Sequence, residues 1–473
     1  VDAQLGDGLP GAAVLSLPRA TIDQACAPGG TVILMGPDPK ETLGALFLRL
    51  RHAVVEDGVT LIELTSRSTG LSPYAQHSLR PAAGEVDKLA AALVAARSGS
   101  SPDTAGVSGA AITAAAAELD GPVTVIVGRP SLAEQAAPTV AAAFALHAAL
   151  PEATFLSALT RGNVHGALDM GMGPGLLPGR QTVGPTPTTW ATAPTEPGLT
   201  TTEILAAAAD GRIDTLVLLG ADPINDFPDH ELARRALEAA NTVIAVDLFV
   251  TDSIASAADI VLAAAAPTEV AGTFTNLEGR VSVLAQKVTP PGTARADWIL
   301  AAELAFQMGH DLAIESAEDV WAELAQVAPI YAGITLDNLE AAQEDGIVVA
   351  GPLSGYQPEP APAVVTDSYG YRLIATRGMY DTGTMLSHCE SSAALAPPAQ
   401  LAMAPADFDG LGVAAGDSVT VLSSVGTISV PAVPDAGVPK GNVAMITHRA
   451  GADAFDLVDC RQPVTGVRVE ATR

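Results

Sequence analysis

The decapeptide GTFTNLEGRV, which begins at Gly272, gathers amide, carboxylate and guanidinium side chains in one short stretch. Asn276, Glu278 and Arg280 together offer the hydrogen-bond donors and acceptors that a polar, planar ligand requires. Gly272 and Gly279 lack a Cβ and would let such a ligand approach the backbone closely. The alternative is that the three polar side chains satisfy one another in a buried network, with Arg280 forked onto a carboxylate.

The tetrapeptide Gly-x-Asp-Pro occurs twice, each time after a strand-length run rich in leucine and β-branched residues. Gly36 and Asp38 belong to the first copy, and Gly220 and Asp222 belong to the second. Such a glycine lets the backbone turn where a strand ends, and the next helix points its amide dipoles at the loop. Ligands bind at these strand ends in doubly wound sheets. One copy alone would be an ordinary turn, but two copies in equivalent places favour a pair of half-sites.

Other reactive side chains give weaker patterns. Cys389 follows His388, and a cysteine beside a histidine can form an activated thiolate. On a strand, adjacent side chains point to opposite faces, so we expect these two not to share a ligand. The sequence has no CxxC or HxxxH spacing, no Ser-His-Asp arrangement and no Walker loop. We therefore predict no catalytic residue and no metal site.

The two Gly-x-Asp-Pro turns lie within predicted β-α-β units. Residues 29–64 have the pattern of strand, turn, helix and strand, and residues 213–284 repeat that order. Residues 121–128 predict a further strand and residues 131–150 a helix. This alternation continues to about residue 345 and favours parallel sheets with helices on both faces.

Three later segments differ in composition. Residues 161–200 are crowded with glycine and proline and predict an extended loop, ordered or mobile, without a long regular element. Residues 346–363 are also rich in proline and glycine and predict a linker. Residues 364–473 contain strand-like runs with short turns, which predict a small β-barrel. The expected organisation is therefore an α/β region over residues 1–345, a linker and a barrel.

The composition limits the function further. A chain of 473 residues, 48% hydrophobic and 16% charged, is long enough for about two to four globular domains. Its 53 acidic and 24 basic residues give a formal net charge of -29. Nucleic acids and anionic membrane surfaces recruit basic patches, so we expect this chain to bind neither.

The sequence also bears on the compartment. No apolar run could cross about 30 Å of hydrocarbon as a helix, and no charged segment followed by an apolar stretch opens the chain. The three cysteines are far apart, which fits a reducing cytoplasm. We therefore expect a soluble chain without membrane insertion. Val1 is not an initiator methionine, so we expect position 1 to be a fragment boundary or a processed end.

Three segments resemble the molybdopterin oxidoreductase family in order and spacing: GADPINDFPD from Gly220, VDLFVTDSIASAADIVL from Val246 and EVAGTFTNLEGRV from Glu269. Residues 401–443 are similar to the family's dinucleotide-binding barrel. The likeness covers nearly the whole chain and implies two pseudo-symmetric Rossmann-like parallel-sheet subdomains plus a C-terminal β-barrel of double-psi type. The stretch RGNVHGALDMGMGPGLLPGR from Arg161 looks most like the large iron-sulfur subunit of NADH:quinone oxidoreductase, respiratory complex I.

In the family's catalytic members, the segment that contains Asn276 lies close to a pterin cofactor. The likeness to complex I implies a relic fold that has lost this molybdopterin, so we expect no cofactor in these residues. We also expect the cleft near Asn276 and Arg280 to be closed by side chains, and an open cavity lined by unpaired donors would count against this. The vestigial candidates on the pterin side are Gly36, Asp38, Gly220, Asp222, Asn276, Glu278 and Arg280.

Three departures from the catalytic members support this loss. Those members carry a cysteine, selenocysteine, serine or aspartate as metal ligand well upstream of the first Gly-x-Asp-Pro. Cys26 is the only upstream cysteine, and it lies in a helix-like stretch too near the strand, where a small buried apolar residue is the simpler interpretation. Thr65 and Ser66 stand where an Asp-Pro-Arg-like strand end is usual, although Glu63 lies close by. Ala263 replaces a customary proline.

The resemblance implies a structural and assembly region of the large peripheral-arm subunit of complex I. Its iron-sulfur clusters would lie in an N-terminal part absent from this chain, and its partners would be other peripheral-arm subunits, including the flavin subunit that oxidises NADH. The complex would hold it at the cytoplasmic side of the membrane. One alternative is a fragment of a molybdenum or tungsten enzyme of the formate dehydrogenase type. Another is a nucleotide-binding module that uses Gly36 and Gly220, although neither loop has a GxGxxG or GxxxxGK[ST] motif.

Overall fold

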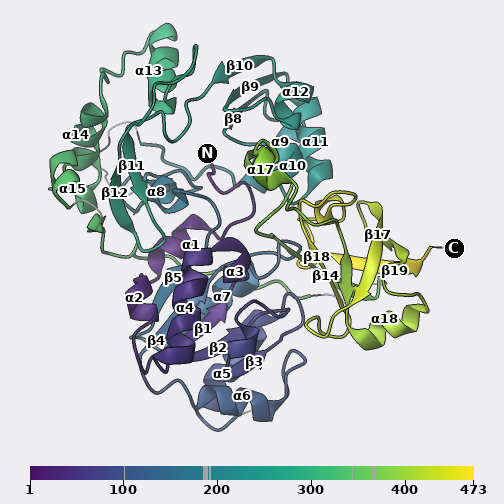
Figure 1. Cartoon of the computed structure of the whole chain (residues 1–473). Helices are drawn as coiled ribbons and strands as arrows, with labels where there is room; N and C mark the ends of the chain where they lie inside the picture. The colour runs from purple at the N-terminus through teal and green to yellow at the C-terminus, as the bar shows by residue number, and fades with distance from the viewer. Residues whose placement is uncertain (101, 185–189, 191–192, 343–344, 365–368, 473) are drawn as a thin grey trace. The chain divides into compact units, whose positions relative to one another are not determined.

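The computed structural model describes residues 1–100, 102–184, 190, 193–342, 345–364 and 369–472. Parts of the predicted loop and barrel therefore lie outside the described residues, namely residues 185–189, 191–192, 365–368 and 473. The chain divides into two compact units, whose elements are labelled in Figure 1. We call Asp7–Thr160, Pro228–Glu231 and Gly355–Arg473 the barrel unit, and Val1–Gly6, Arg161–Phe227 and Leu232–Ser354 the hairpin unit.

A five-stranded parallel sheet, in the order β3-β2-β1-β4-β5, forms one part of the barrel unit. Every residue of β1 and β4 is buried, as expected for central strands covered on both faces. Thr31 of β1 pairs with Thr60 on one side and with Val123 on the other, which confirms the predicted β-α-β unit over residues 29–64. The strands are β1 (Thr31–Met35), β2 (Thr60–Leu64), β3 (His77–Leu79), β4 (Val123–Val127) and β5 (Thr154–Ser157).

The helices of this region bury small and branched apolar side chains on one face. In α4, for example, Leu46, Leu50 and Ala53 are buried at helical spacing. The helices are α1 (Gly11–Ser16), α2 (Ile22–Ala25), α3 (Pro39–Thr42), α4 (Gly44–Glu56), α5 (Val86–Ala96), α6 (Gly109–Ala116) and α7 (Ala137–Ala149).

The helix predicted over residues 131–150 begins only at Ala137. The preceding residues are not helical because their backbone pairs with the barrel. The amide of Leu132 donates to the carbonyl of Ala375 at 2.8 Å, and the carbonyl of Ala133 accepts from the amide of Thr465 at 2.8 Å. This segment joins the sheet to the barrel within the unit.

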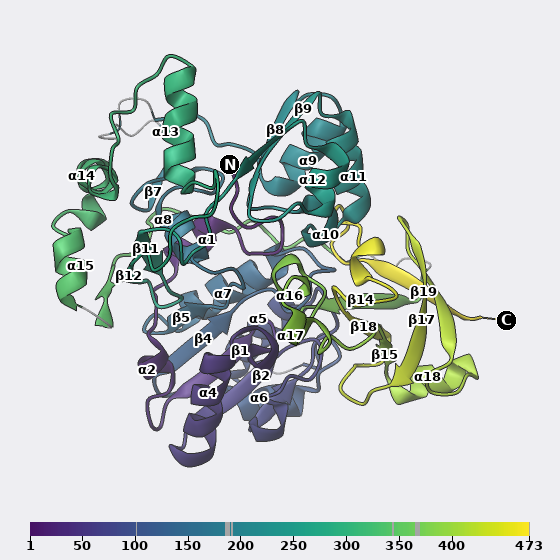
Figure 2. The same ribbon diagram turned by 45° about the horizontal axis from the view of Figure 1, so that its top comes forward.

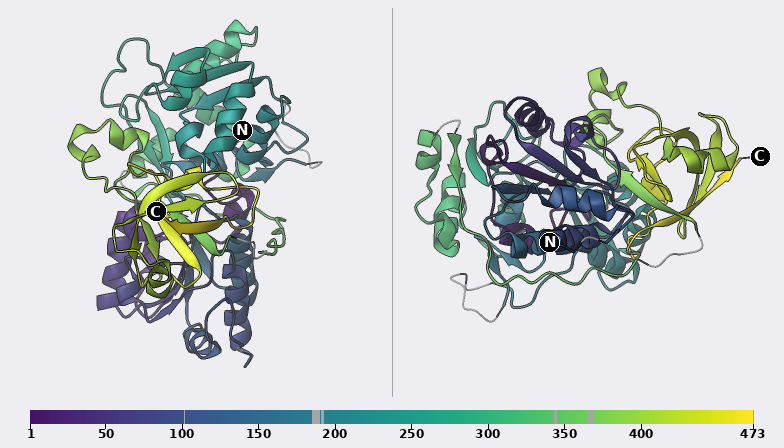
Figure 3. Two further views of the ribbon diagram at one scale, coloured as in Figure 1. Left: turned by 90° about the vertical axis from the view of Figure 1, so that its right-hand side faces the viewer. Right: turned by 90° about the horizontal axis from the view of Figure 1, so that it is seen from below.

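The C-terminal strands close into a six-stranded barrel in the order β14-β18-β15-β17-β16-β19, which confirms the predicted barrel. The left-hand view of Figure 3 looks onto these strands. Alternate residues point inward, so that Val419, Val430 and Val443 form its core. The elements are β14 (Tyr371–Thr376), α16 (Thr384–Ser387), α17 (Glu390–Ala393), β15 (Leu401–Met403), α18 (Pro405–Leu411), β16 (Ser418–Leu422), β17 (Thr427–Pro434), β18 (Asn442–Ile446) and β19 (Gly466–Ala471).

The hairpin unit contains the second parallel sheet, in the order β10-β9-β8. Figure 2 shows three helices, α9, α11 and α12, together on one side of this sheet. The prediction of helices on both faces is wrong here, since alternate residues of β8 stay exposed. The elements are α9 (Thr201–Ala209), β8 (Thr215–Leu219), α10 (Pro223–Asp226), α11 (His230–Ala239), β9 (Thr242–Asp247), α12 (Asp252–Ala257) and β10 (Ile260–Ala263).

The rest of the hairpin unit packs around an antiparallel sheet. Its strands are joined in the order β11-β12-β13, and Trp321 and Tyr331 lie in the adjoining core. The described part of the predicted loop 161–200 holds only short elements, as expected, and the predicted linker 346–363 contains β13. The elements are α8 (Val164–Asp169), β6 (Leu176–Leu177), β7 (Gln181–Thr182), β11 (Gly272–Thr275), β12 (Arg280–Leu284), α13 (Asp297–Gln307), α14 (Ala317–Val327), α15 (Leu336–Ala342) and β13 (Ile347–Val348).

Candidate functional site

The barrel unit has a small pocket at the carboxyl ends of its parallel strands. Its volume is about 80 Å³. The lining residues lie at or shortly after the carboxyl ends of β1, β2 and β4 of the sheet and of β14 and β18 of the barrel. They include Gly36, Asp38, Thr65, Arg67, Thr376 and Arg377. Two of the residues singled out from the sequence therefore line a pocket where ligands bind in doubly wound sheets.

Gly36 lies where two strands approach closely. A Cβ built at this position would stand 3.1 Å from the amide nitrogen of Gly128 and 3.4 Å from its Cα. Gly36 does not have a positive φ, whereas Gly220 has a φ of 56° and open space around it. The expected sharp turn therefore requires glycine only in the second copy, and the first copy requires it for strand packing.

The Gly36→Ala substitution is expected to lower the free energy of unfolding by about 1–3 kcal/mol, because the backbone of Gly128 must shift to admit the methyl group. Chemical denaturation of the whole chain, followed by circular dichroism, measures this loss. Gly44→Ala is the control, because nothing lies within 4 Å of a Cβ at Gly44. If the two variants were equally stable, close packing would not explain Gly36.

Two carboxylates that line the pocket accept hydrogen bonds from nearby backbone amides. Asp38 Oδ1 accepts from the amide of Lys40 at 2.9 Å, and Oδ2 accepts from the amide of Gly70 at 2.8 Å. Glu41 Oε2 accepts from the amide of Met379 at 2.9 Å. Burial raises the pKa of Asp38, and the two amide hydrogen bonds oppose this shift. These amides are therefore already satisfied by side chains of the same chain.

The two arginines that line the pocket are also paired with carboxylates. Arg377 Nη2 donates to Asp7 Oδ2 at 2.8 Å, and Arg67 Nη2 lies 3.8 Å from Asp435 Oδ2. Glu63 lies close to the strand end where catalytic members carry an Asp-Pro-Arg-like motif. It is fully buried and accepts hydrogen bonds from the hydroxyls of Thr69 and Ser78. It belongs to a local network and does not line the pocket.

Asp222, in the second Gly-x-Asp-Pro copy, has a local role in the hairpin unit. It is buried, and its Oδ1 accepts from the hydroxyl of Ser253 at 2.5 Å. Its Oδ2 accepts from Asn225 Nδ2 at 2.7 Å. These bonds connect the turn after β8 to α12. Gly220 supplies the left-handed backbone that the turn requires.

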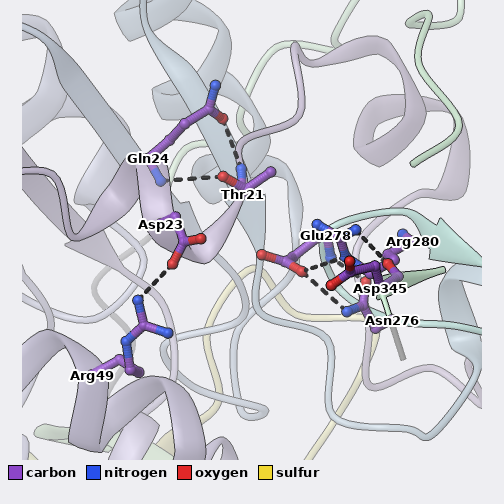
Figure 4. Close-up of polar contacts among 8 residues, drawn as sticks. All are labelled: Thr21, Asp23, Gln24, Arg49, Asn276, Glu278, Arg280 and Asp345. Atoms are coloured by element: carbon purple, nitrogen blue, oxygen red, sulfur yellow. Dashed lines mark hydrogen bonds and ion pairs between the residues drawn. The ribbon is translucent and has the colours of Figure 1, made fainter. Parts of the chain in front are cut away.

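Asn276, Glu278 and Arg280 form a network at the β11–β12 turn (Figure 4). Asn276 Oδ1 accepts from the amides of Glu278 and Arg280 at 2.9 and 3.0 Å, and its Nδ2 donates to Glu278 Oε2 at 3.2 Å. Arg280 Nε donates to the same carboxylate oxygen at 3.3 Å, while Nη1 donates to the carbonyl of Asp345. The expected fork onto a carboxylate is wrong, because only one of these two contacts is ionic. The side chains are half-buried and satisfy one another.

The structure reveals a buried ion pair that sequence reasoning missed. Arg180 Nε and Nη2 donate to the two carboxylate oxygens of Asp169, both at 2.8 Å. The hydroxyl of Tyr331 donates to Asp169 Oδ2 at 3.1 Å, and Arg180 Nη1 donates to the carbonyl of Gly351 at 2.7 Å. The sequence signal was weak: one aspartate and two arginines inside the glycine-rich loop. This pair ties the two ends of residues 169–180 together.

Cys26 ends α2 and does not face the pocket residues. It is half-buried, and burial raises the pKa of its thiol. Figure 4 shows how α2 is held: Thr21 and Gln24 form a capping box at its start, and Asp23 pairs with Arg49 at 2.6 Å. These contacts are those of a structural helix end.

The other two cysteines lie far from this helix in the sequence. The strand predicted for His388 and Cys389 is wrong, since they lie between the short helices α16 and α17. Hydrogen bonds with Ser391 and Ser392 lower the pKa of the exposed Cys389 thiol. Burial raises the pKa of Cys460 to about 12. In the part of the chain that the structure describes, no three His, Cys, Asp or Glu side chains gather as metal ligands.

Two family models match this chain. One, described as molybdopterin oxidoreductase, matches residues 5–307, and the other, described as molydopterin dinucleotide binding domain, matches residues 372–467. Among solved structures, acetylene hydratase from Pelobacter acetylenicus is similar with a TM-score of 0.72 at 15% identity, over 98% of this chain and 81% of that chain. That likeness shows the fold alone.

Curated relatives have different printed activities. The chain is 33% identical over 294 residues to an NADH-quinone oxidoreductase subunit of Rhizobium meliloti, which covers 60% of this chain and 34% of the relative. It is 32% identical over 318 residues to the alpha subunit of F420-dependent formate dehydrogenase 2 of Methanococcus maripaludis, with 60% and 46% covered. The chain thus spans less than half the length of either relative.

Proposed function

This chain belongs to the molybdopterin oxidoreductase family, and from that premise we propose that it is a non-catalytic scaffold region of the large peripheral-arm subunit of an NADH:quinone oxidoreductase. The observation that carries the proposal is the pocket of the barrel unit, whose lining carboxylates Asp38 and Glu41 accept hydrogen bonds from neighbouring backbone amides. The relative from Rhizobium meliloti, whose name is that of an NADH-quinone oxidoreductase subunit, supports the choice within the family.

The dimensions of the pocket fit a pterin dinucleotide poorly. Its volume is about 80 Å³, whereas pockets for small-molecule ligands typically measure about 300–1,000 Å³. A dinucleotide could enter the barrel unit only if side chains at the ends of β1 and β2 moved away. This poor fit supports the hypothesis that this region has lost the pterin cofactor.

The charges around the pocket lead to the same proposal. A diphosphate is bound by free backbone amides and by unpaired cations. Here Asp38 and Glu41 accept from the amides, and Arg377 is paired with Asp7. A diphosphate would have to displace these carboxylates and would be repelled by them. The residues around the pocket therefore do not fit a pterin dinucleotide.

The scaffold role includes a location and partners. We propose that the chain packs against other peripheral-arm subunits, including the flavin subunit, and that the iron-sulfur clusters lie in an N-terminal part of the same protein. The complex would hold it at the cytoplasmic side of the membrane. Among the described residues, no helix is both long and apolar enough to span a bilayer.

A second candidate is a molybdenum or tungsten enzyme of the formate dehydrogenase type. The observation in its favour is the relative from Methanococcus maripaludis, at an identity close to that of the NADH-quinone oxidoreductase subunit. This candidate requires a bound pterin and a metal ligand, whereas the pocket of the barrel unit measures only about 80 Å³ and its two arginines are paired with carboxylates.

Metal and pterin analysis of the native complex tests the proposal. Molybdenum, tungsten and iron are measured by elemental mass spectrometry on complex purified through this chain, and pterin dinucleotide is extracted from the same sample. We expect iron without molybdenum, tungsten or pterin. A formate dehydrogenase carried through the same purification shows that the cofactor survives it. Stoichiometric molybdenum or tungsten with pterin would contradict the scaffold role and favour the second candidate.

A further inference from the structure

One face of the sheet in the hairpin unit lies open. Val217, Ile244 and Ile260 are register partners across β8, β9 and β10 and therefore share a face. On this face Val217 is 55% exposed and Ile260 is 47% exposed. Parallel sheets are normally buried on both faces. The helices α9, α11 and α12 cover only the other face (Figure 2).

The helix that stands on the open side, α13, also lacks a cover. None of its eleven residues is buried, and Leu304 and Phe306 are 44% and 62% exposed. Its start nevertheless lies beside the sheet, because the backbone of Arg295 forms an isolated parallel β-bridge with Ala264, just after β10. Figures 1 and 2 both place α13 apart from the sheet, opposite α9, α11 and α12.

An open groove of about 620 Å³ runs along α13 and is also lined by Leu262 of β10 and by the segment that follows the helix. Leu262 is the residue of β10 that lines it, and most of the remaining lining comes from α13, with Trp298 and Leu304 among its apolar members, and from residues 311–315. The described residues that line this groove include three with charged side chains, all of them acidic: Glu303, Asp311 and Glu315. The groove is therefore apolar within and negative at its rim.

We propose that this groove docks an amphipathic helix of a partner protein whose apolar face is flanked by lysine or arginine. An apolar lining suits a helix laid into a groove, and the acidic rim selects basic flanks. A second copy of this chain is a poor occupant, because its charge of -29 would oppose an acidic rim. The proposal extends the scaffold role by naming one docking surface, and it involves neither metal nor pterin.

Two synthetic helical peptides of about five turns test the proposal on the full chain. Both carry leucine at helical spacing, and the remaining positions are lysine in one peptide and glutamate in the other. Binding is measured at physiological salt by peptide fluorescence anisotropy and by the change in tryptophan emission, to which Trp298 contributes because it is half-buried in the groove. We expect the lysine peptide to bind and the glutamate peptide to bind at least about tenfold more weakly.

Two pairs of variants separate groove binding from general attraction to an acidic chain. Leu304→Glu with Phe306→Glu removes exposed apolar side chains, and we expect the affinity for the lysine peptide to fall at least about tenfold. The control, Leu48→Glu with Val55→Glu, changes two equally exposed apolar residues of α4 and should leave the affinity unchanged.

Reversal of the rim charge gives the second comparison. Glu303→Lys with Glu315→Lys should lower the affinity for the lysine peptide and raise the affinity for the glutamate peptide. The control pair, Glu56→Lys with Glu152→Lys, changes exposed residues and should alter neither affinity by more than about twofold. The proposal is wrong if neither peptide binds, or if each groove variant behaves like its control. The metal and pterin content of the complex is independent of all these outcomes, so the two proposals fail separately.

Discussion

Replacement of Arg180 by methionine is expected to lower the free energy of unfolding of the hairpin unit by about 3–5 kcal/mol. Arg180 is 8% exposed and Asp169 is fully buried, and two hydrogen bonds of 2.8 Å join them. Methionine keeps the apolar stem of the side chain but removes the cation. The carboxylate of Asp169 then stays buried without its partner, which is the costly state of a buried ion pair.

The position of the pair adds to this loss. Tyr331, also fully buried, donates to Asp169, and Arg180 reaches the carbonyl of Gly351. Arg180 has a φ of 57°, a strained backbone for a residue other than glycine, which surrounding contacts must hold in place. Removal of the guanidinium therefore frees both the glycine-rich loop and the segment before Ser354.

Chemical denaturation followed by tryptophan fluorescence measures the effect. The three tryptophans, Trp190, Trp298 and Trp321, all belong to the hairpin unit, so their emission reports on its unfolding. The matched control is Arg280→Met, whose ion pair with Glu278 is more exposed. We expect this control to lose no more than about 1 kcal/mol.

The double variant Asp169→Leu with Arg180→Met supplies the decisive comparison. It removes both charges, so we expect it to regain a large part of the stability lost in Arg180→Met. If Arg180→Met were as mild as Arg280→Met, the pair would not hold the loop. If the double variant were less stable than the single variant, the loss would come from packing and not from an uncompensated charge.

Local pattern predicted most of the regular structure. The β-branched runs at β1 and β4 gave strands because such side chains pack well between two layers of helices. The barrel followed from alternating runs such as β17, where every second residue up to Ala432 is buried. The two Gly-x-Asp-Pro turns also lie at strand ends, as expected. These features depend on neighbours that are close in sequence.

The missed features depend on contacts between segments far apart in the chain. Gly36 is required by the approach of Gly128, which no local pattern contains. Arg280 takes the carbonyl of Asp345 in place of a second carboxylate oxygen. The exposed face of α13 could not be anticipated either, because its apolar pattern is that of an ordinary covered helix. Each of these facts appears only once the chain is folded.

Glu134 provides the second large effect, a pH-dependent one. It lies in the segment between the sheet and the barrel, and burial raises the pKa of its carboxyl to about 7 from an ordinary 4.5. Arg129, Arg372 and the amide of Gly84 oppose this shift, while Asp87 adds to it. The folded state thus favours the protonated carboxyl more than the unfolded state does. Its contribution to stability is complete below pH 4.5 and is lost as the pH rises through 7.

The Glu134→Gln substitution keeps the shape of the protonated side chain and removes its titration. We expect the variant to match the wild type at about pH 4 or below and to exceed its stability by about 1–3 kcal/mol at pH 8. Thermal and chemical denaturation of both chains from about pH 4 to 8 measures this difference. The titration of the other acidic residues is common to the two chains and therefore cancels when their stabilities are subtracted. The exposed Glu152→Gln is the control and should show no pH-dependent difference.

The opposite sign would be informative. If Glu134→Gln were less stable than the wild type at pH 8, the carboxyl would be ionised in the folded state and bound to Arg129 as a buried ion pair. Attraction to the two arginines would then outweigh burial. The expected sign instead follows from the position of Glu134, which is 4% exposed and has one carboxylate oxygen on the amide of Gly84. For a carboxyl buried this deeply, the free energy of hydration lost by the ionised form exceeds the attraction that the two arginines provide.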